Sequence, residues 1–381
     1  MIKKVLILLL SAVVLLGAAC KRIDEPSGGD VLLTFRIGEP VTKATTPGDG
    51  NVADGGGVYC TEAEGVVTPD LVIFIFDEDG TLKKRYPTDG VLTEHNYASG
   101  HATTLSVSFG SSGWEDGAYT VFALANIGGT GGNLDIPDLS SITSITQLDN
   151  LQMGISSGTA PQVGDRMPLS ASGTLHVAKG LYDKYNGLVE LEMLRCFAKV
   201  QLTFRNLTGV LLTLTNCSVK FNDMNTKKAW LFPREPDFVT LGDTNPSDSK
   251  DDNYGDYTTV AANISTANLT NIPSTDDLLT DDDERDRVAF VSPILFFPSI
   301  APKQTVPSAG NRYLCNISFN VGNATKNFID LPIHDEFTQD IPVLKRNQYL
   351  QILTTIGKGT NVSFNFFVKN WEEHNESVTF N

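Results

Sequence analysis

The side chains that most often carry chemistry are scattered in this chain of 381 residues. Five histidines are present, and none has a second ligand at the spacing that a metal site needs. They are His95, His101, His176, His334 and His374. Residues 110–113 (GSSG) do not match the Gly-x-Ser-x-Gly turn of hydrolases, and no histidine can be assigned to a serine nucleophile. The sequence therefore predicts that the protein is not an enzyme.

Two acidic stretches and one glycine-rich stretch are the remaining candidates for ligand binding. Residues 248–256 and 281–284 could hold calcium, because hard cations take carboxylate ligands, but neither has EF-hand spacing. Solvated surface loops are the favoured interpretation of both. Residues 128–132 (GGTGG) lack the Lys-Ser/Thr of a phosphate-binding loop. We therefore expect neither a cofactor nor a metal ion.

The sequence does not determine whether or how four of the cysteines pair. Cys60, Cys196, Cys217 and Cys315 contain no C-x-x-C pair and no zinc-type spacing. One or two disulfides could form outside the cytoplasm, but the four side chains could equally be buried as apolar residues.

The fifth cysteine, Cys20, ends a segment with the order of a secretory signal. Lys3 and Lys4 precede an apolar run over residues 5–16, interrupted only by Ser11, and small residues fill positions 17–19. The run is shorter than the roughly 20 residues that cross a membrane as a helix. The position of Cys20 resembles a bacterial lipobox, in which the cysteine sulfur receives diacylglycerol before cleavage. The alternative is an ordinary signal peptide with a chance cysteine.

These features predict that residues 1–20 are a lipoprotein signal peptide and that the mature chain lies outside the cytoplasm. Two or more acyl chains on Cys20 would make the membrane attachment stable. The net charge of −16, from 29 Lys and Arg and 45 Asp and Glu, argues against nucleic-acid binding, because phosphate contacts need a basic surface.

The secondary-structure elements that the sequence predicts, and that would hold any functional site, are mostly short strands. Apolar runs and alternating patterns, separated by turn residues, predict strands along most of the chain. They cover residues 31–37, 71–76, 105–109, 118–126, 167–177, 188–194, 196–204, 211–221, 288–297, 313–321, 328–333, 348–356 and 362–368. Residues 196–204 and 211–221 are expected to pair with each other. One helix is expected over residues 141–153, where Ile142, Ile145, Leu148 and Leu151 have helical spacing.

The pattern predicts an all-β fold of two tandem β-sandwich domains, transthyretin- or immunoglobulin-like, with short helical insertions. We expect a tether and first strand over residues 21–43, an N-terminal domain over 44–187 and a C-terminal domain over 188–381.

Six phrases, in order along the chain, resemble the FimA-type fimbrillin family, the subunits of type V fimbriae in Gram-negative gut and oral anaerobes. They are VIFIFDEDGTLKK (72–84), AYTVFALANIGG (118–129), RMPLSASG (166–173), LEMLRCFAKVQL (191–202), VLKRNQYLQILTTI (343–356) and FFVKNWEEHNESVTF (366–380). Leu169 departs from the Met-Ser-Gly pattern usual in the third phrase. The phrases span nearly the whole chain behind the lipobox, although no single one is specific.

The resemblance implies assembly by strand exchange. A protease removes the first strand of the exported lipoprotein, here residues 31–40, and the C-terminal strand of another subunit fills the groove. The matching cut lies between Lys43 and Ala44, where the best-known members have Arg. Arg36 is a second candidate, inside a strand-like run. An uncut Lys43 would leave a lipid-bound anchor.

The expected donor strand is the C-terminal segment. Val362, Phe364, Phe366 and Val368 alternate on one face, and Val378 and Phe380 resume the pattern at the chain end. The alternative for this segment is an ordinary last strand of the second domain.

The function implied is a structural subunit of cell-surface fimbriae that supports adhesion. The partners are other fimbrial subunits, a processing protease and, through the lipid, the cell outer membrane. One alternative is a fimbrial anchor or tip accessory that keeps its lipid. Another is a surface glycan-binding lipoprotein, but the three tryptophans that could form a platform, Trp114, Trp230 and Trp371, are isolated in the sequence.

Overall fold

The computed structural model describes most of the predicted strands. The described residues are 29–37, 58–63, 66–98, 101–127, 134–155, 167–182, 184–222, 224–225, 228–233, 254–255, 269–272, 274, 288–290, 294–296, 299–300, 313–334 and 343–370. The expected signal peptide (1–20), the acidic loop at 281–284, the glycine-rich stretch at 128–132 and, except for 254–255, the acidic stretch at 248–256 lie outside these ranges.

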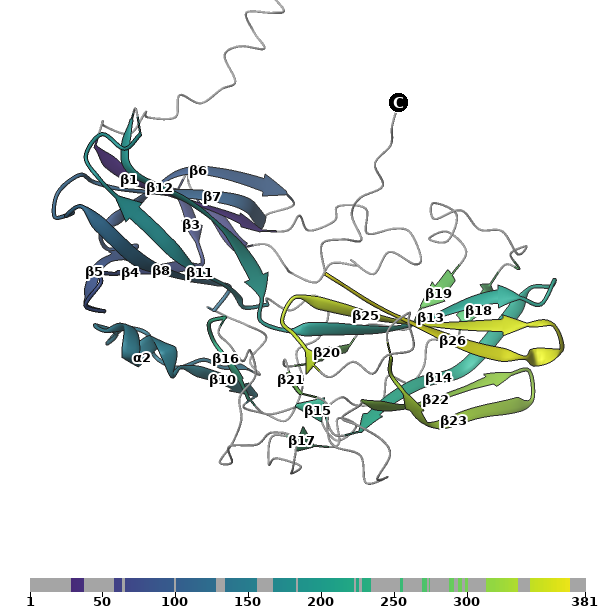
Figure 1. The fold of residues 1–381 in the computed structure, drawn as a ribbon. Helices are drawn as coiled ribbons and strands as arrows, with labels where there is room; N and C mark the ends of the chain where they lie inside the picture. Colours follow the sequence, from purple (N-terminus) through teal and green to yellow (C-terminus); the bar gives the residue numbers. More distant parts are fainter. Residues whose placement is uncertain are drawn as a thin grey trace, which may run out of the picture.

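The N-terminal part of the chain forms one ten-stranded sheet with the order β3-β2-β7-β1-β12-β11-β8-β4-β5, and β6 pairs with β7 (Figure 1). The strands are β1 (Asp30–Ile37), β2 (Val58–Ala63), β3 (Val66–Pro69), β4 (Leu71–Phe76), β5 (Leu82–Tyr86), β6 (Gly90–Ala98), β7 (His101–Phe109), β8 (Gly117–Ala125), β11 (Leu169–Val177) and β12 (Tyr185–Arg195). Inward side chains of β1 and β7 share one buried core with those of β4, β8 and β11. The sheet therefore folds over on itself and packs like a sandwich.

Strand β4 is apolar throughout because it is buried on both faces. Ile73 and Ile75 point into the sandwich core, whereas Phe74 and Phe76 belong to a second core on the opposite face of the sheet. This second core is covered by helix α2 (Ile145–Asp149) and contains Phe232 from the C-terminal half. The ring of Phe232 lies 5.2 Å from that of Phe122.

A small sheet at the same place combines strands from both halves of the chain. Its order is β16-β10-β9, with β9 (Leu134–Asp135), β10 (Gln152–Ile155) and β16 (Lys228–Trp230). Because β16 comes from the C-terminal half and pairs with β10, it joins the two halves by backbone hydrogen bonds.

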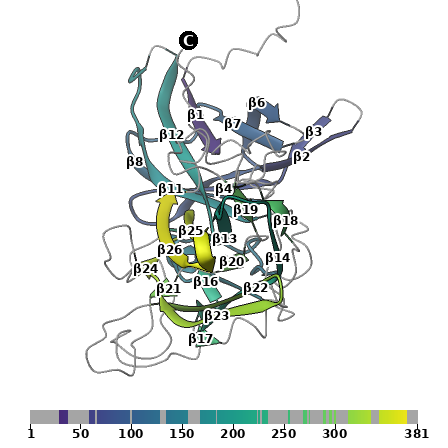
Figure 2. The same cartoon turned by 90° about the vertical axis from the view of Figure 1, so that its right-hand side faces the viewer.

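The C-terminal half contains a five-stranded sheet, β19-β13-β25-β26 with β20 on β13, and a four-stranded sheet, β18-β14-β22-β23 (Figure 2). Their strands are β13 (Ala198–Leu207), β14 (Leu212–Asn222), β18 (Leu269–Ile272), β19 (Val288–Phe290), β20 (Ile294–Phe296), β22 (Leu314–Val321), β23 (Ala324–Pro332), β25 (Gln348–Gly357) and β26 (Val362–Asn370). Two short pairs, β15 (Met224–Asn225) with β17 (Tyr254–Gly255) and β21 (Ser299–Ile300) with β24 (Val343–Leu344), complete the described strands.

Side chains of both C-terminal sheets meet in one core, as in a sandwich. The ring of Phe204 in β13 and that of Phe319 in β22 lie edge to face, 5.2 Å apart.

The prediction of an all-β, sandwich-like fold is confirmed. The expected pairing of 196–204 with 211–221 is wrong, because β13 and β14 lie in different sheets of the C-terminal sandwich. The helix expected over 141–153 is reduced to α2, whose start is fixed by the side chain of Gln147 accepting the Ser144 N–H at 3.1 Å. The expected boundary between residues 187 and 188 falls within β12. No described helix is long and apolar enough to cross a membrane.

Candidate functional site

The most unusual element of the fold is β1, which is far in sequence from one of its neighbours and lies in the middle of the large sheet. It pairs antiparallel with β7 and parallel with β12. The strands β3, β2, β7 and β6 lie on one side of it, and β12, β11, β8, β4 and β5 on the other. Removal of β1 would therefore divide the sheet and leave a groove one strand wide between β7 and β12.

The side chains on one face of β1 are buried in the core. Val31, Leu33 and Phe35 are 0% exposed and Ile37 is 3% exposed. The register places Leu33 between Val107 and Val189. Burial of one such side chain contributes about 1.5–3 kcal/mol, so four in a row hold the strand strongly.

The opposite face of β1 makes polar contacts. The Thr34 and Ser106 hydroxyls are 3.1 Å apart. Arg36 Nε lies 2.6 Å from Glu190 Oε1, with both side chains more than half exposed.

The start of β1 is also held by hydrogen bonds. Asn186 Nδ2 donates to the Gly29 carbonyl at 2.7 Å. Ser108 Oγ donates to the buried Asp30 at 3.3 Å. The strand is therefore fixed at its start as well as along its length.

The predicted processing residues relate to β1 in different ways. Cys20, Lys43 and Ala44 lie outside the described residues. Arg36, the second candidate for cleavage, lies inside β1 with a neighbouring strand on each side. Proteases cleave exposed and locally unfolded backbone, so Arg36 is a poor target while β1 is paired.

The expected donor residues divide into two groups. Val362, Phe364, Phe366 and Val368 lie in β26, which pairs with β25 along its whole length. All four pack against the C-terminal core, and the ring of Phe364 lies 4.8 Å from that of Phe328. Val378 and Phe380 lie outside the described residues. In this structure the first group therefore forms part of the last described strand of the C-terminal sandwich.

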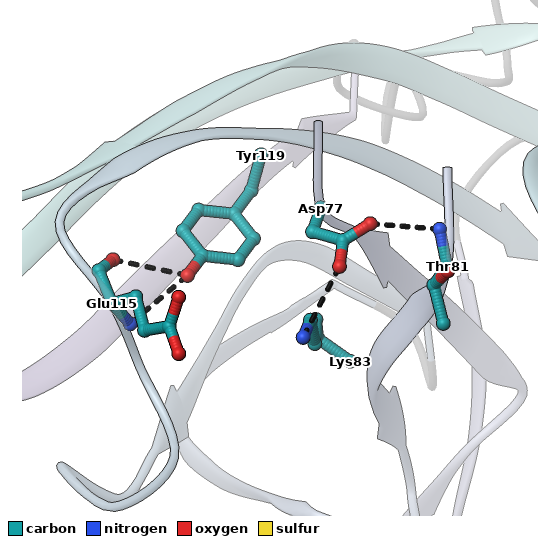
Figure 3. A network of polar contacts seen from close by, with 5 residues as sticks. All are labelled: Asp77, Thr81, Lys83, Glu115 and Tyr119. Atoms are coloured by element: carbon teal, nitrogen blue, oxygen red, sulfur yellow. Dashed lines mark hydrogen bonds and ion pairs between the residues drawn. The ribbon is translucent and has the colours of Figure 1, made fainter. Parts of the chain in front are cut away.

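The turn between β4 and β5 places several charged groups together (Figure 3). Asp77 Oδ1 accepts the Thr81 N–H at 2.8 Å, and Asp77 Oδ2 lies 3.1 Å from Lys83 Nζ. The hydrogen bond from Thr81 and, to a smaller extent, the Lys83 ammonium lower the pKa of Asp77 below its ordinary value. Gly80 closes the turn with a φ of +74°, which favours glycine. This explains the Asp-x-x-Gly pattern as a turn.

An open hollow of about 420 Å³ lies beside this turn, lined by residues 77–80, 118–120, Ile145 and Thr174. The hydroxyl of Tyr119 is already used, since it donates to the Glu115 carbonyl and accepts the Glu115 N–H, both at 3.0 Å. The carboxylate of Asp77 is likewise engaged within the turn. Both of these groups are therefore already committed to contacts within the protein.

The other candidates from the sequence do not come together either. Among the described residues, no group of three His, Cys, Asp or Glu side chains is placed to hold a metal ion. Cys60, Cys196, Cys217 and Cys315 form no disulfide with one another in the described part of the chain. Burial raises the pKa of Cys217 to about 11 and that of Cys315 to about 12.

Trp114 does not present a flat aromatic platform to solvent. Its ring lies edge to face with Tyr119 at 5.1 Å, and Lys84 Nζ lies 5.7 Å from the ring centroid. Its Nε1 donates to the Gly110 carbonyl at 3.0 Å. The residue is therefore held by its own neighbours.

Arg346 contacts both halves of the chain, and no pattern in the sequence marked it for this role. Arg346 is 5% exposed, in the turn before β25. Its Nη1 donates to Ser170 Oγ in β11 at 2.8 Å, and its Nη2 donates to the carbonyls of Trp230 and Phe232 at 3.0 and 3.3 Å. The only signal in the sequence was that Arg346 lies in LKRNQYL, within one of the phrases that resemble the fimbrillin family. This signal does not indicate which groups the side chain binds.

Glu190 and Glu192 were also missed as members of the site. They alternate with Val189, Leu191 and Met193 along β12 and are exposed. Alternation alone predicts that such residues face solvent, but it cannot show that they border β1.

Comparison with known proteins identifies relatives of this chain. The family described as "Fimbrillin-A associated anchor proteins Mfa1 and Mfa2" matches residues 43–377. Among curated proteins, none matches.

Several solved structures are similar to this chain. The tip fimbrial protein Mfa3 from Porphyromonas gingivalis, with a C-terminal truncation, is 11% identical over 90% of this chain and 100% of its own, with a TM-score of 0.45. A fimbrilin (fimA) from the same species is 11% identical over 91% and 98%, with a TM-score of 0.45. A fimbrial assembly protein from Parabacteroides distasonis is 13% identical over 91% and 97%, with a TM-score of 0.36.

Proposed function

Because the chain belongs to the family of fimbrillin-A associated anchor proteins, we propose that it is a structural subunit of a cell-surface fimbria that supports adhesion. It is exported as a lipoprotein precursor, cut by a protease and joined to other subunits by exchange of β-strands. It acts at the cell outer membrane and in the extracellular fimbrium.

The observation that carries this proposal is the position of β1. A central strand with four buried apolar side chains, bordered by β7 and β12, is what an exchangeable strand requires. Its departure would expose apolar side chains and unpaired backbone groups on both flanking strands. An incoming strand satisfies both, which gives the exchange its driving force.

The maturation steps concern residues on the N-terminal side of the sheet. Cys20 takes the lipid, and the protease cuts between Lys43 and Ala44. A cut there separates β1 from the rest of the chain, since β1 ends at Ile37 and the next described strand starts at Val58. Arg36 is the poorer site because both of its strand neighbours would have to be released first.

The donated segment is the C-terminal one. Donation of Val362, Phe364, Phe366 and Val368 would remove four side chains from the C-terminal core, at a cost comparable to their burial. Val378 and Phe380 have the same alternation, and they follow β26 in the chain. We therefore propose that the residues after 370 insert first into the groove of the neighbouring subunit. Strand β26 then stays in its own subunit, where it connects the inserted segment to the fold.

The decisive experiment is mass spectrometry of the surface-assembled protein to read its N-terminus. Polymers that begin at Ala44 support the proposal, and Lys43→Ala should then accumulate as an unpolymerised precursor. Lys21→Ala serves as the matched control because it also removes one lysine before the cut. Polymers that still carry residues 31–43 would contradict the proposal.

The donor segment needs a separate test. Deletion of residues 372–381 should leave a folded, processed subunit that no longer polymerises. If the truncated subunit polymerises as well as the full chain, this segment is not the donor. Circular dichroism of the truncated protein checks that the fold is retained.

A second candidate function is a membrane anchor that keeps its lipid on Cys20 and its β1. The family, whose described members include anchor proteins, favours this role. The same mass spectrum separates the two candidates, because an anchor would retain the modified Cys20 at its N-terminus.

A further inference from the structure

The groove between β7 and β12 that β1 occupies has a polar face opposite the core, and this face carries acidic charge on the β12 side only, while Ser106 and Ser108 on the β7 side are buried. On β12, the outward positions along β1 are Leu188, Glu190 and Glu192, all exposed. On β7, the outward positions opposite β1 are Thr104, Ser106 and Ser108, which carry hydroxyls and no charge. At these six paired positions of β7 and β12, a strand between them therefore meets two carboxylates and no Lys or Arg.

In the present structure β1 places one cation beside these two carboxylates. Arg36 is opposite Glu192 in the parallel register, and its Nε lies 2.6 Å from Glu190 Oε1. Because Arg36 is 67% and Glu190 51% exposed, the pair adds little to overall stability. Its larger effect is discrimination, since an acidic side chain at the same position would meet two like charges on the adjacent strand.

The chain's own C-terminal residues do not supply this cation. Lys369 is the last Lys or Arg of the sequence, and the twelve residues that follow it hold Glu372, Glu373 and Glu376. In the alternating segment that ends at Phe380, Val378 and Phe380 would face inward and Ser377 and Thr379 outward. A second copy of this chain would therefore bring Ser377, Thr379 and, further back, Glu373 to this acidic border, and no Lys or Arg.

We propose that Glu190 and Glu192 select the incoming strand, and that the partner is a different subunit whose strand carries Lys or Arg at the position of Arg36. This inference rests on the proposed strand exchange and adds the identity of the preferred strand. It makes the groove a site for hetero-assembly, with copies of this chain as weak partners.

The test uses the Leu33→Asp variant with a specific protease site inserted between Lys43 and Ala44, because the buried charge should make the cut β1 fragment leave and empty the groove. After cutting, fluorescent peptides of residues 29–38 are offered with the native Arg36 or with Arg36→Lys, Arg36→Gln or Arg36→Glu, and binding is followed by anisotropy. The Arg and Lys peptides should bind about fivefold more tightly than the Gln peptide, and the Glu peptide should be weakest. A peptide of residues 370–381 should compete poorly, and the differences should shrink in high salt.

The control is the double variant Glu190→Gln and Glu192→Gln, which should bind all four peptides alike. Glu78→Gln, in the β4–β5 turn, removes one negative charge away from β1 and should keep the preference. Equal binding of the Arg and Glu peptides to the cut chain would overturn the proposal, as would tight binding of residues 370–381. Failure of every peptide, including the native one, would instead overturn strand exchange at this groove.

Discussion

Arg346 Nη1 donates to Ser170 Oγ at 2.8 Å, so that a side chain from the turn before β25 enters the N-terminal sheet. The same guanidinium binds the carbonyls of Trp230 and Phe232. Together with the β10–β16 pairing and the shared core around Phe74 and Phe122, this contact joins the two halves of the chain. The two halves should therefore unfold together.

The first prediction follows from that contact. Arg346→Leu removes the donor side chain of four hydrogen bonds, to Ser170 Oγ, Cys196 Sγ and the carbonyls of Trp230 and Phe232, and so leaves these buried acceptors without that partner. We expect the free energy of unfolding to fall by about 2–4 kcal/mol. Urea denaturation followed by tryptophan fluorescence measures it. Ser170→Ala, which removes the acceptor of one of these bonds and a weak contact with Cys196 Sγ, should cost about 1 kcal/mol. Equal stability of Arg346→Leu and the native chain would show that the contact does not join the halves.

The second prediction concerns the two faces of β1. Phe35→Ala should lower the free energy of unfolding of the uncut chain by about 3–5 kcal/mol, because Phe35 is 0% exposed in the core. Thr34→Ala, the neighbour on the polar face, should cost less than about 1 kcal/mol. Thermal unfolding of both variants in parallel provides the measurement. Similar losses at the two positions would contradict the one-sided burial of β1.

The third prediction is that cleavage alone does not empty the groove. After a cut at an inserted protease site between Lys43 and Ala44, the fragment that contains β1 should remain bound through its two strand neighbours and its four buried side chains. Size-exclusion chromatography followed by mass spectrometry should find it with the main chain. In Leu33→Asp, a buried charge should release the fragment after the cut. A native fragment that separates at once would mean that β1 is held weakly.

The fourth prediction is a loss of stability at alkaline pH. Cys217 and Cys315 have folded pKa values of about 11 and about 12, against an ordinary value of 9.0. Between pH 9.0 and its own folded pKa, each thiol binds more protons in the folded chain than in the unfolded chain. The free energy of unfolding should therefore fall as pH rises above about 9.

Urea denaturation at several pH values checks this fourth prediction. The double variant Cys217→Ala and Cys315→Ala should lose less stability between pH 9 and pH 11, although its stability at neutral pH is lower because of the missing sulfurs. Parallel losses in both proteins would show that other groups, such as Tyr86, whose pKa burial also raises, are responsible.

The sequence by itself predicted the strands whose pattern is local. The strand-like pattern of residues 31–37 predicts β1, and the apolar run in 71–76 predicts β4. The strand that ends in Ala-Asn was expected as well. Only the structure shows why Asn126 stands there: it is buried with a φ of 60°, and its side chain accepts the Tyr59 N–H and donates to the Met167 carbonyl.

The partners of these strands were decided by the tertiary structure. Period-2 alternation shows which face of a strand is apolar, but it carries no information about which distant strand will pair with it. Asn186 and Gly29, at the start of the β1–β12 pairing, are separated by 157 positions. The incorrect pairing of 196–204 with 211–221 arose because neighbours in sequence were taken as neighbours in a sheet, whereas each joins a different layer around one core. The roles of Glu190, Glu192 and Arg346 depend on such long-range contacts, and no local pattern marks them.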